Sequence, residues 1–184
     1  MQVKETGIQG LVEIFPSAFP DERGWFFEFY KEEVFRKNGI PTAFPQENIS
    51  FSKKGVLRGL HFQRPPYAQG KLVTVIKGKV LDIVVDLRIA SPTFGKTYYC
   101  TLDGEKHNML MVPEGFAHGF VALEESFFYY KCTNVYSKAH ESGIVWNDPD
   151  LKIQWPVENP IVSDKDQLLP TFQELLRNSV ISQH

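Results

Sequence analysis

Hydrophobic residues in this chain fall in short runs that Gly, Pro or polar residues interrupt. Residues 72–76 (Leu-Val-Thr-Val-Ile) are largely apolar and β-branched, which is typical of a buried strand. Residues 77–79 (Lys-Gly-Lys) predict a turn into a second strand over 80–86. The pattern also predicts apolar segments over 108–113 and 115–123, and further strands over 11–15, 25–30, 45–52, 97–102 and 126–136.

Helical signals are few and short. Residues 31–38 predict a helix that ends before Gly39, with Pro41 just beyond. Residues 149–160 are rich in Pro and predict an irregular tail, and residues 167–178 predict a short amphipathic helix. Many short strands broken by Gly and Pro favour an all-β sandwich or barrel, a jelly roll in particular, with small peripheral helices. We expect one domain over residues 1–184.

Composition narrows the class of protein. The 42% hydrophobic content is enough for a core, and 20 basic against 22 acidic residues give a net charge of -2 without a basic stripe. We therefore expect no nucleic-acid partner. Cys100 and Cys132 are too few for a disulfide framework. The first residues lack an apolar signal core and no run is long enough to span a membrane, so we expect a cytoplasmic protein without a membrane partner.

The stretch 55–82 concentrates polar groups among apolar neighbours, namely Arg58, His61, Lys71 and Asp82. Buried ionisable groups are costly unless paired, so this concentration indicates a site. Taken alone, His61 is more typical of a structural group whose hydrogen bonds are satisfied, and only complementary groups from other segments favour a catalytic role. Arg58 and His61 have opposite parity in a regular strand, and Gly59 would permit a bulge that points both to one side.

Three further segments add candidate groups. In residues 113–120, His118 lies between two glycines that allow close backbone approach, although a tight turn with an incidental His explains the same pattern. Tyr129 and Tyr130 occur in a β-rich segment, where tyrosines often serve only packing. Residues 163–166 (Ser-Asp-Lys-Asp) are, taken alone, a solvated loop.

Together these segments resemble the dTDP-4-dehydrorhamnose 3,5-epimerases, a family of cupin-fold enzymes that act on a nucleotide-linked 4-keto-6-deoxy sugar. The resemblance covers nearly the whole chain, and its motifs are specific. They occur in the family's order: Arg23-Gly24 with Glu28, Gln46-Glu47-Asn48, Arg58-Gly59-Leu60-His61-Phe62-Gln63, Lys71, residues 113–120, Tyr130-Lys131, Trp146-Asn147-Asp148 and Lys165-Asp166.

The resemblance implies a role for each matching residue. His61 corresponds to the base, and Asp166 to the carboxylate that orients it. Lys71 corresponds to the cation beside the ketone oxygen, and Tyr130 to the acid on the opposite face of the sugar. The other matches are ligand-binding positions: Arg58 and His118 for diphosphate and sugar, Arg23, Glu28, Gln46 and Asn48 for the nucleotide, and Glu141 and Lys165 for further contacts.

Two assignments stay open at this level. The span from His118 to Tyr130 is one residue shorter than the family's usual spacing, so Tyr129 fits a different gap placement. We prefer Tyr130 because Lys131 and the residues after it then align. Asp82 is a second candidate partner for His61 or Lys71, and the sequence does not rank it against Asp166.

The implied roles suit the chemistry. Removing a proton next to a ketone needs a base on one face and a group that stabilises the enolate oxygen, and inversion needs an acid on the other face. Both C3 and C5 flank the C4 ketone, so one such set serves both centres without a cofactor. Many cupins bind metal through a His-x-His pair, but His61 is followed by Gln63, so we expect no metal.

The resemblance thus implies epimerisation at C3 and C5 of dTDP-4-dehydro-6-deoxy-D-glucose to dTDP-4-dehydro-L-rhamnose, in dTDP-L-rhamnose biosynthesis. It also implies a homodimer whose interface includes N-terminal strands, with some nucleotide contacts reaching across. The alternatives are a C3-only epimerase or 3,4-ketoisomerase of a related sugar, a non-catalytic sugar-binding cupin, and a metal-dependent cupin dioxygenase. The presence of both His61 and Tyr130 favours epimerisation at both centres.

Overall fold

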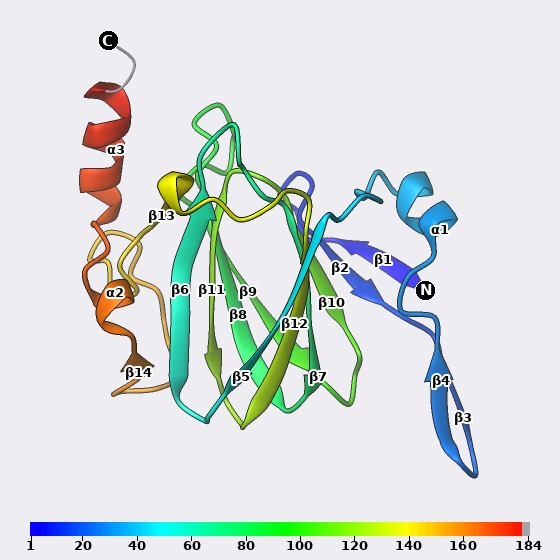
Figure 1. Ribbon diagram of the computed structural model, residues 1–184. Coiled ribbons are helices and arrows are strands. Elements are labelled where there is room, and N and C mark those ends of the chain that lie inside the picture. Colours follow the sequence, from blue (N-terminus) through cyan, green and yellow to red (C-terminus); the bar gives the residue numbers. More distant parts are fainter. Residues whose placement is uncertain (182–184) are drawn as a thin grey trace.

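Two antiparallel sheets form the body of the protein in the computed structural model, which describes residues 1–181 (Figure 1). The first sheet has, in spatial order, β1 (Gln2–Glu5), β2 (Val12–Phe15), β10 (Met109–Val112), β7 (Lys71–Lys77), β12 (Ser126–Cys132) and β5 (Gln46–Ser52). The second has β13 (Glu141–Gly143), β6 (Val56–Gln63), β11 (Phe116–Ala122), β8 (Lys79–Asp86) and β9 (Thr97–Asp103), with β14 (Ile161–Val162) parallel to β6. The predicted jelly-roll class is confirmed.

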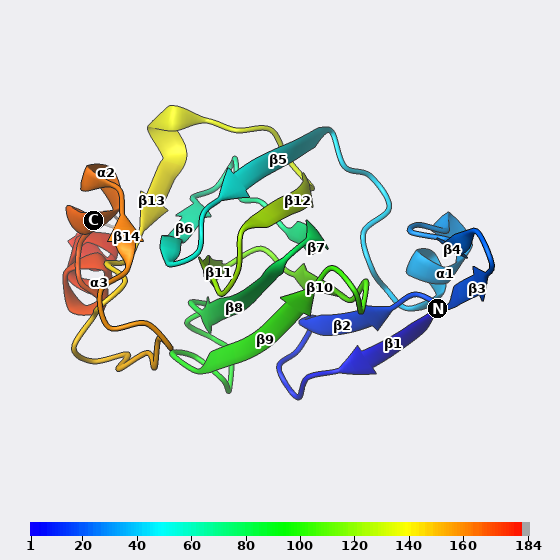
Figure 2. The same ribbon diagram turned by 90° about the horizontal axis from the view of Figure 1, so that it is seen from below.

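The main core lies between the two sheets, because apolar side chains from both contribute to one cluster. Val73 and Val75 come from the first sheet, and Val80, Val84 and Phe120 from the second. Seen from below, the C-terminal helices lie at the opposite end of the molecule from helix α1 (Glu32–Lys37) and the N-terminus (Figure 2). Among the described residues, no helix is long and apolar enough to cross a membrane.

Two predicted strand features are wrong in detail. Ile76 was expected to be buried, but it is exposed. Leu72, on the same face of β7, is covered by Phe35 and Ile40, and Ile76 lies beyond that cover. The strand predicted over 126–136 ends at Cys132, because its partner on β5 is Gln46, the first residue of that strand, and one further backbone bond, from the Thr133 amide to the Gly70 carbonyl, follows on the β7 side.

The N-terminal region forms a separate hairpin that projects from the sandwich, made of β3 (Ala18–Asp21) and β4 (Gly24–Phe27) (Figure 1). The strand predicted over 25–30 therefore ends at Phe27, which pairs with Ala18. Further pairing would bring residue 29 opposite Pro16, which has no N–H to donate. Aromatic side chains on this hairpin are exposed, and its predicted part in a dimer interface stays a prediction.

The helices are short, as predicted, but the C-terminal helix begins later than expected. Helix α1 ends at Lys37, and Gly39 follows it with a φ of 67°. Residues 167–178 were predicted as one helix, whereas α2 (Asp164–Gln167) and α3 (Phe172–Ile181) are separate. Pro170 separates them, and Thr171 and Glu174 form a reciprocal capping box that fixes the start of α3. A 3₁₀ turn spans Lys138–His140.

A bulge in β6 places Arg58 and His61 on the same side of the sheet. His118 pairs with His61, and Phe120 pairs with Arg58. Between these two pairs β6 advances by three residues and β11 by only two, so β6 contains one extra residue. Gly59 adopts a φ of 134° within this step. A Cβ on Gly59 would come 2.5 Å from the Gly119 Cα. The sequence-based hypothesis of a bulge at Gly59 is thus confirmed, and its basis is close backbone contact between two glycines.

We predict that Gly119→Ala lowers the free energy of unfolding by about 1–3 kcal/mol, the usual cost of an overpacked interior. The added Cβ would lie 2.7 Å from the Arg58 carbonyl oxygen, which is backbone and cannot rotate away. Gly70→Ala is the matched control, because its Cβ would meet only side-chain atoms of Met111 and Thr133. Urea denaturation of both variants measures the difference, and equal losses would contradict the steric explanation.

Candidate active site

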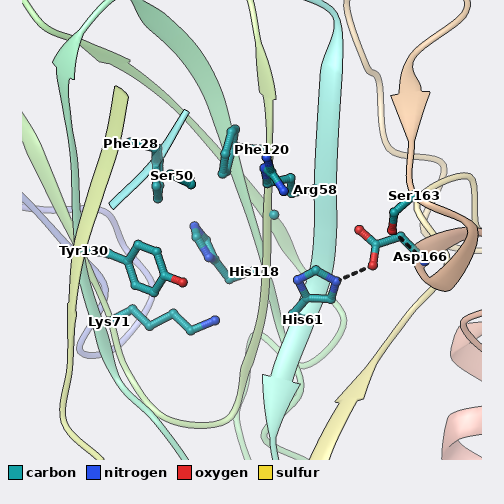
Figure 3. A pocket seen from close by; sticks show the side chains of 11 residues that line it. Ser50, Arg58, His61, Lys71, His118, Phe120, Phe128, Tyr130, Ser163 and Asp166 are labelled. Carbon is teal, nitrogen blue, oxygen red and sulfur yellow. Dashed lines mark hydrogen bonds and ion pairs between the residues drawn. The ribbon is translucent and has the colours of Figure 1, made fainter. Parts of the chain in front are cut away.

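One cavity between the sheets collects most of the residues that the sequence singled out. It has a volume of about 260 Å³. Strands β5, β6, β7, β11 and β12 and the short helix α2 all contribute to it (Figure 3). Its lining comprises Ser50, Arg58, His61, Lys71, His118, Gly119, Phe120, Phe128, Tyr130, Ser163 and Asp166.

A second chamber of about 130 Å³ adjoins the first and shares His61, Lys71 and Tyr130 with it. This chamber brings in Gln46, Asn48 and Glu141, three of the predicted ligand-binding residues. Gln46 and Asn48 alternate along β5, and the Gln46 side chain donates to Asn48 Oδ1 at 3.1 Å. The period of two in β5 therefore produces the polar face that the sequence predicted.

His61 is held by Asp166, which comes from α2. The distance from His61 Nε2 to Asp166 Oδ1 is 2.7 Å, and the Gly59 amide donates to Asp166 Oδ2 at 3.2 Å. Although burial alone would raise it, these hydrogen bonds lower the pKa of the Asp166 carboxyl. Ser163 caps α2 and accepts from the Asp166 amide, so the carboxylate is both ionised and fixed beside the ring.

Asp82 contacts a different histidine. Its Oδ2 lies 2.8 Å from His118 Nε2, and the Asp82 side chain is completely buried. The question that the sequence left open is therefore answered by geometry: Asp166 partners His61, and Asp82 partners His118. The sequence offered no signal for the second pair, because it joins residues on two neighbouring strands, β8 and β11.

Lys71 extends into the pocket from the start of β7 (Figure 3). Its ammonium has no hydrogen-bond or salt-bridge partner within the part of the chain that the structure describes. Burial lowers the pKa of Lys71, and nearby Cys132, Asp82 and Glu141 oppose that fall. The ammonium is thus available to an incoming anionic or carbonyl oxygen.

Tyr130 lies across the pocket from His61, and its hydroxyl points toward that side (Figure 3). Burial raises the pKa of Tyr130, so the phenol keeps its proton at neutral pH. Tyr129 points the other way, since successive side chains alternate, and its hydroxyl donates to Glu47 Oε2 at 2.8 Å. The geometry therefore agrees with the choice of Tyr130 over Tyr129.

Of the remaining predicted ligand contacts, Arg58 lines the first chamber and Glu141 the second, and Lys165 is attached to Glu141. The Arg58 guanidinium donates to Ser52 Oγ and to the Phe51 carbonyl, both at 3.1 Å. Lys165 pairs with Glu141 at 2.6 Å. The Tyr136 hydroxyl donates to the other oxygen of Glu141 at 2.8 Å, a contact that the sequence did not indicate.

Arg23 and Glu28 do not lie in either chamber of this chain. Arg23 is in the turn of the projecting hairpin and pairs with Asp21 at 2.6 Å. Glu28 follows β4 and faces Lys31. A single chain therefore does not assemble these two predicted nucleotide contacts, and their part in ligand binding stays a prediction.

Two aromatic wall residues were missed by the sequence reasoning. Phe120 and Phe128 stack at 4.2 Å between ring centroids and line the cavity. Phe120 lies two residues after His118, and Phe128 two residues before Tyr130. Strand periodicity, applied from the candidate residues outward, could have found both. Within residues 1–181, no group of three or more His, Cys, Asp or Glu side chains is arranged to hold a metal.

The fold and the cavity define a jelly-roll protein of the cupin type whose interior presents an oriented histidine, a free ammonium and a phenol. The chain belongs to the dTDP-4-dehydrorhamnose 3,5-epimerase family, whose model matches residues 5–174.

Individual relatives agree with this assignment. The chain is 50% identical over 168 residues to dTDP-4-dehydrorhamnose 3,5-epimerase of Shigella flexneri, covering 90% of this chain and 93% of the relative. The crystal structure of the Elizabethkingia anophelis enzyme superposes with a TM-score of 0.90 at 45% identity, covering 95% and 97% of the two chains. The Legionella pneumophila enzyme in complex with dTDP-4-keto-L-rhamnose gives 0.88 at 41% identity, covering 94% and 93%.

Proposed function

We propose that the protein epimerises C3 and C5 of dTDP-4-dehydro-6-deoxy-D-glucose to give dTDP-4-dehydro-L-rhamnose, a step of dTDP-L-rhamnose biosynthesis. Family membership and the similar Legionella complex support the substrate class. The observation that carries the proposal is the convergence of His61, Lys71 and Tyr130 on one cavity, with Asp166 behind His61.

His61 is the proposed base. With Asp166 at Nε2, the other ring nitrogen is left to accept a proton from the carbon next to the ketone. The C–H electron pair moves into the C–C bond and the carbonyl π electrons move onto oxygen, which gives an enolate. The Lys71 ammonium stabilises that oxygen, because it has no competing partner within the described chain and acts in a partly buried site.

Tyr130 is the proposed acid on the opposite face. Its phenol donates a proton to the carbon while the enolate collapses back to the ketone, which inverts the centre. The proton on His61 then returns to solvent and Tyr130 is reprotonated. The same set of groups acts at the second centre, and no electron leaves the substrate, so the chemistry requires no cofactor.

Ligand binding falls to the remaining residues. Arg58 and His118 hold the diphosphate and sugar, Gln46 and Asn48 contact the nucleotide, and the paired Glu141 and Lys165 supply further contacts. Arg23 and Glu28 are exposed on or beside the projecting hairpin. In a homodimer the hairpin would carry them to a partner's cavity, as the family resemblance implies.

The direct test is NMR of the 4-keto sugar nucleotide with enzyme in deuterated water. We expect deuterium at both C3 and C5, because each proton is removed and replaced from solvent. Label at C3 alone would instead identify a C3 epimerase, and movement of the ketone a ketoisomerase. Absence of any exchange would favour a binding protein. His61→Ala is the control, in which label should enter neither position.

Tyr130→Phe should separate deprotonation from inversion. Without the phenol, His61 still removes a proton and returns a solvent-derived one to the same face, so exchange continues. Net inversion should fall by roughly 10²–10⁴-fold, the usual contribution of one general acid. Tyr129→Phe is the matched control on the outer face and should leave both rates unchanged. The reverse pattern would mean that the wrong tyrosine has been assigned.

Activity should also fall at alkaline pH as Lys71 loses its proton. The pKa of Lys71 is lowered by burial, so the loss should be centred below the ordinary lysine value of about 10.4. Tyr130 does not titrate first, because its pKa is raised. The pH profile of kcat/KM measures this limb. Lys71→Arg, which keeps its charge, should move the limb to higher pH, and an unmoved limb would exclude Lys71 as its source.

A further inference from the structure

A second histidine–carboxylate pair lies at the pocket, and the proposed function gives a binding role to its histidine, His118, but none to its carboxylate, Asp82. His118 Nε2 lies 2.8 Å from Asp82 Oδ2, and both side chains are buried. His118 is the register partner of His61 across β6 and β11, so the two imidazoles lie side by side in the sheet. Each of the two rings contacts one carboxylate through its Nε2, His61 with Asp166 and His118 with Asp82.

Asp82 is unusual because only one of its oxygens is satisfied. Its Oδ1 is buried and has no hydrogen-bond partner within the described chain. Its register partner on β9 is Cys100, a buried thiol that offers at best a weak S–H donor. Burial, assisted by the nearby Asp82 charge, raises the pKa of Cys100. Within the described chain no donor pairs with the second oxygen, although the Lys71 ammonium is near enough to interact with the Asp82 charge through space.

An incompletely satisfied buried carboxylate costs stability. Buried polar groups without a full set of hydrogen bonds are typical of functional sites, where the lost stability is accepted in return for activity. A residue that served only the fold would be better replaced here by a neutral side chain. The structural feature that Asp82 does serve is the orientation of His118, whose ring also packs against Phe128.

We propose that Asp82 is a positioning residue for the epimerase site: it holds the Nε2–H of His118 and so leaves Nδ1 for an anionic oxygen of the ligand. An ionised carboxylate only accepts, so Nε2 must carry the hydrogen in this pair. As a diphosphate or enolate oxygen binds, Nδ1 takes up a proton from solvent and the ring donates to that oxygen. The Asp82 carboxylate stabilises the positive charge that the ring then carries. This inference rests on the proposed function for the identity of the ligand.

The first measurement needs no variant. Long-range ¹H–¹⁵N NMR of the ligand-free wild-type protein reports which nitrogen of His118 is protonated, and we expect a proton on Nε2. A ring protonated on Nδ1 alone would overturn the proposal. This result does not depend on activity, so it stays interpretable if the wild-type protein fails to epimerise the sugar nucleotide and the proposed function itself is wrong.

The second measurement compares Asp82→Asn with Cys100→Ala, a neutral change in the same layer. We expect the Asn variant to unfold at a temperature no lower than the parent, since an uncharged amide is cheaper to bury. Its kcat/KM should fall roughly 10- to 100-fold, because the amide oxygen still accepts from Nε2 but no longer offsets the positive charge of the ring. Cys100→Ala should keep the parent's kcat/KM. A lower melting temperature with unchanged kcat/KM would show that Asp82 is only structural.

A double-mutant cycle tests whether Asp82 acts through His118. In a His118→Asn background, Asp82→Asn should cause little further loss of kcat/KM, because the ring that it positions is gone. A full additive loss would overturn the assigned route. The cycle uses the change between two variants, so a general effect of His118→Asn on folding cancels.

Discussion

The active-site geometry depends on one close backbone contact, between Gly59 of β6 and Gly119 of β11. No side chain fits there, since a Cβ on either residue would come within 2.7 Å of opposing backbone. The contact accompanies the extra residue in β6, which cancels the strand alternation between Arg58 and His61. Without it one of these two side chains would face away from the cavity. Packing between two glycines thus determines which chemistry the pocket contains.

The polar groups around the cavity fall into two kinds. His61 and His118 are each fixed by a buried carboxylate, which sets the orientation of the rings before any ligand arrives. Lys71, by contrast, extends into the same space without a hydrogen-bond or salt-bridge partner in the described chain, and it bears the cost of burial as a lowered pKa. Preorganised groups beside an unsatisfied cation are what a developing enolate requires.

The alternation of side chains along β-strands predicted much of the fold and of the cavity from the sequence. It identified the polar face of β5, the strands β7 and β8, and the need for a bulge at Gly59. It did not predict features that depend on how distant segments meet. The His118–Asp82 pair requires the order of strands in the second sheet, and the start of α3 requires the Thr171–Glu174 capping box to outweigh the amphipathic pattern before it. Arg23 illustrates the same limit, because the folded chain does not bring it to either chamber.

The C-terminal tail has a larger part in the site than its irregular sequence suggests. Asp166 lies 105 residues after His61, on a helix of four residues that follows the short strand β14, which pairs with β6. Asp148 also fixes the tail, because its carboxylate accepts from the amides of Phe172, Asp150 and Leu151. The Phe172 ring then packs with Leu60, the residue between the bulge and His61. The tail segment that carries Asp166 is therefore packed against the part of strand β6 that contains the bulge and His61. The orientation of His61 and the docking of the tail thus depend on each other.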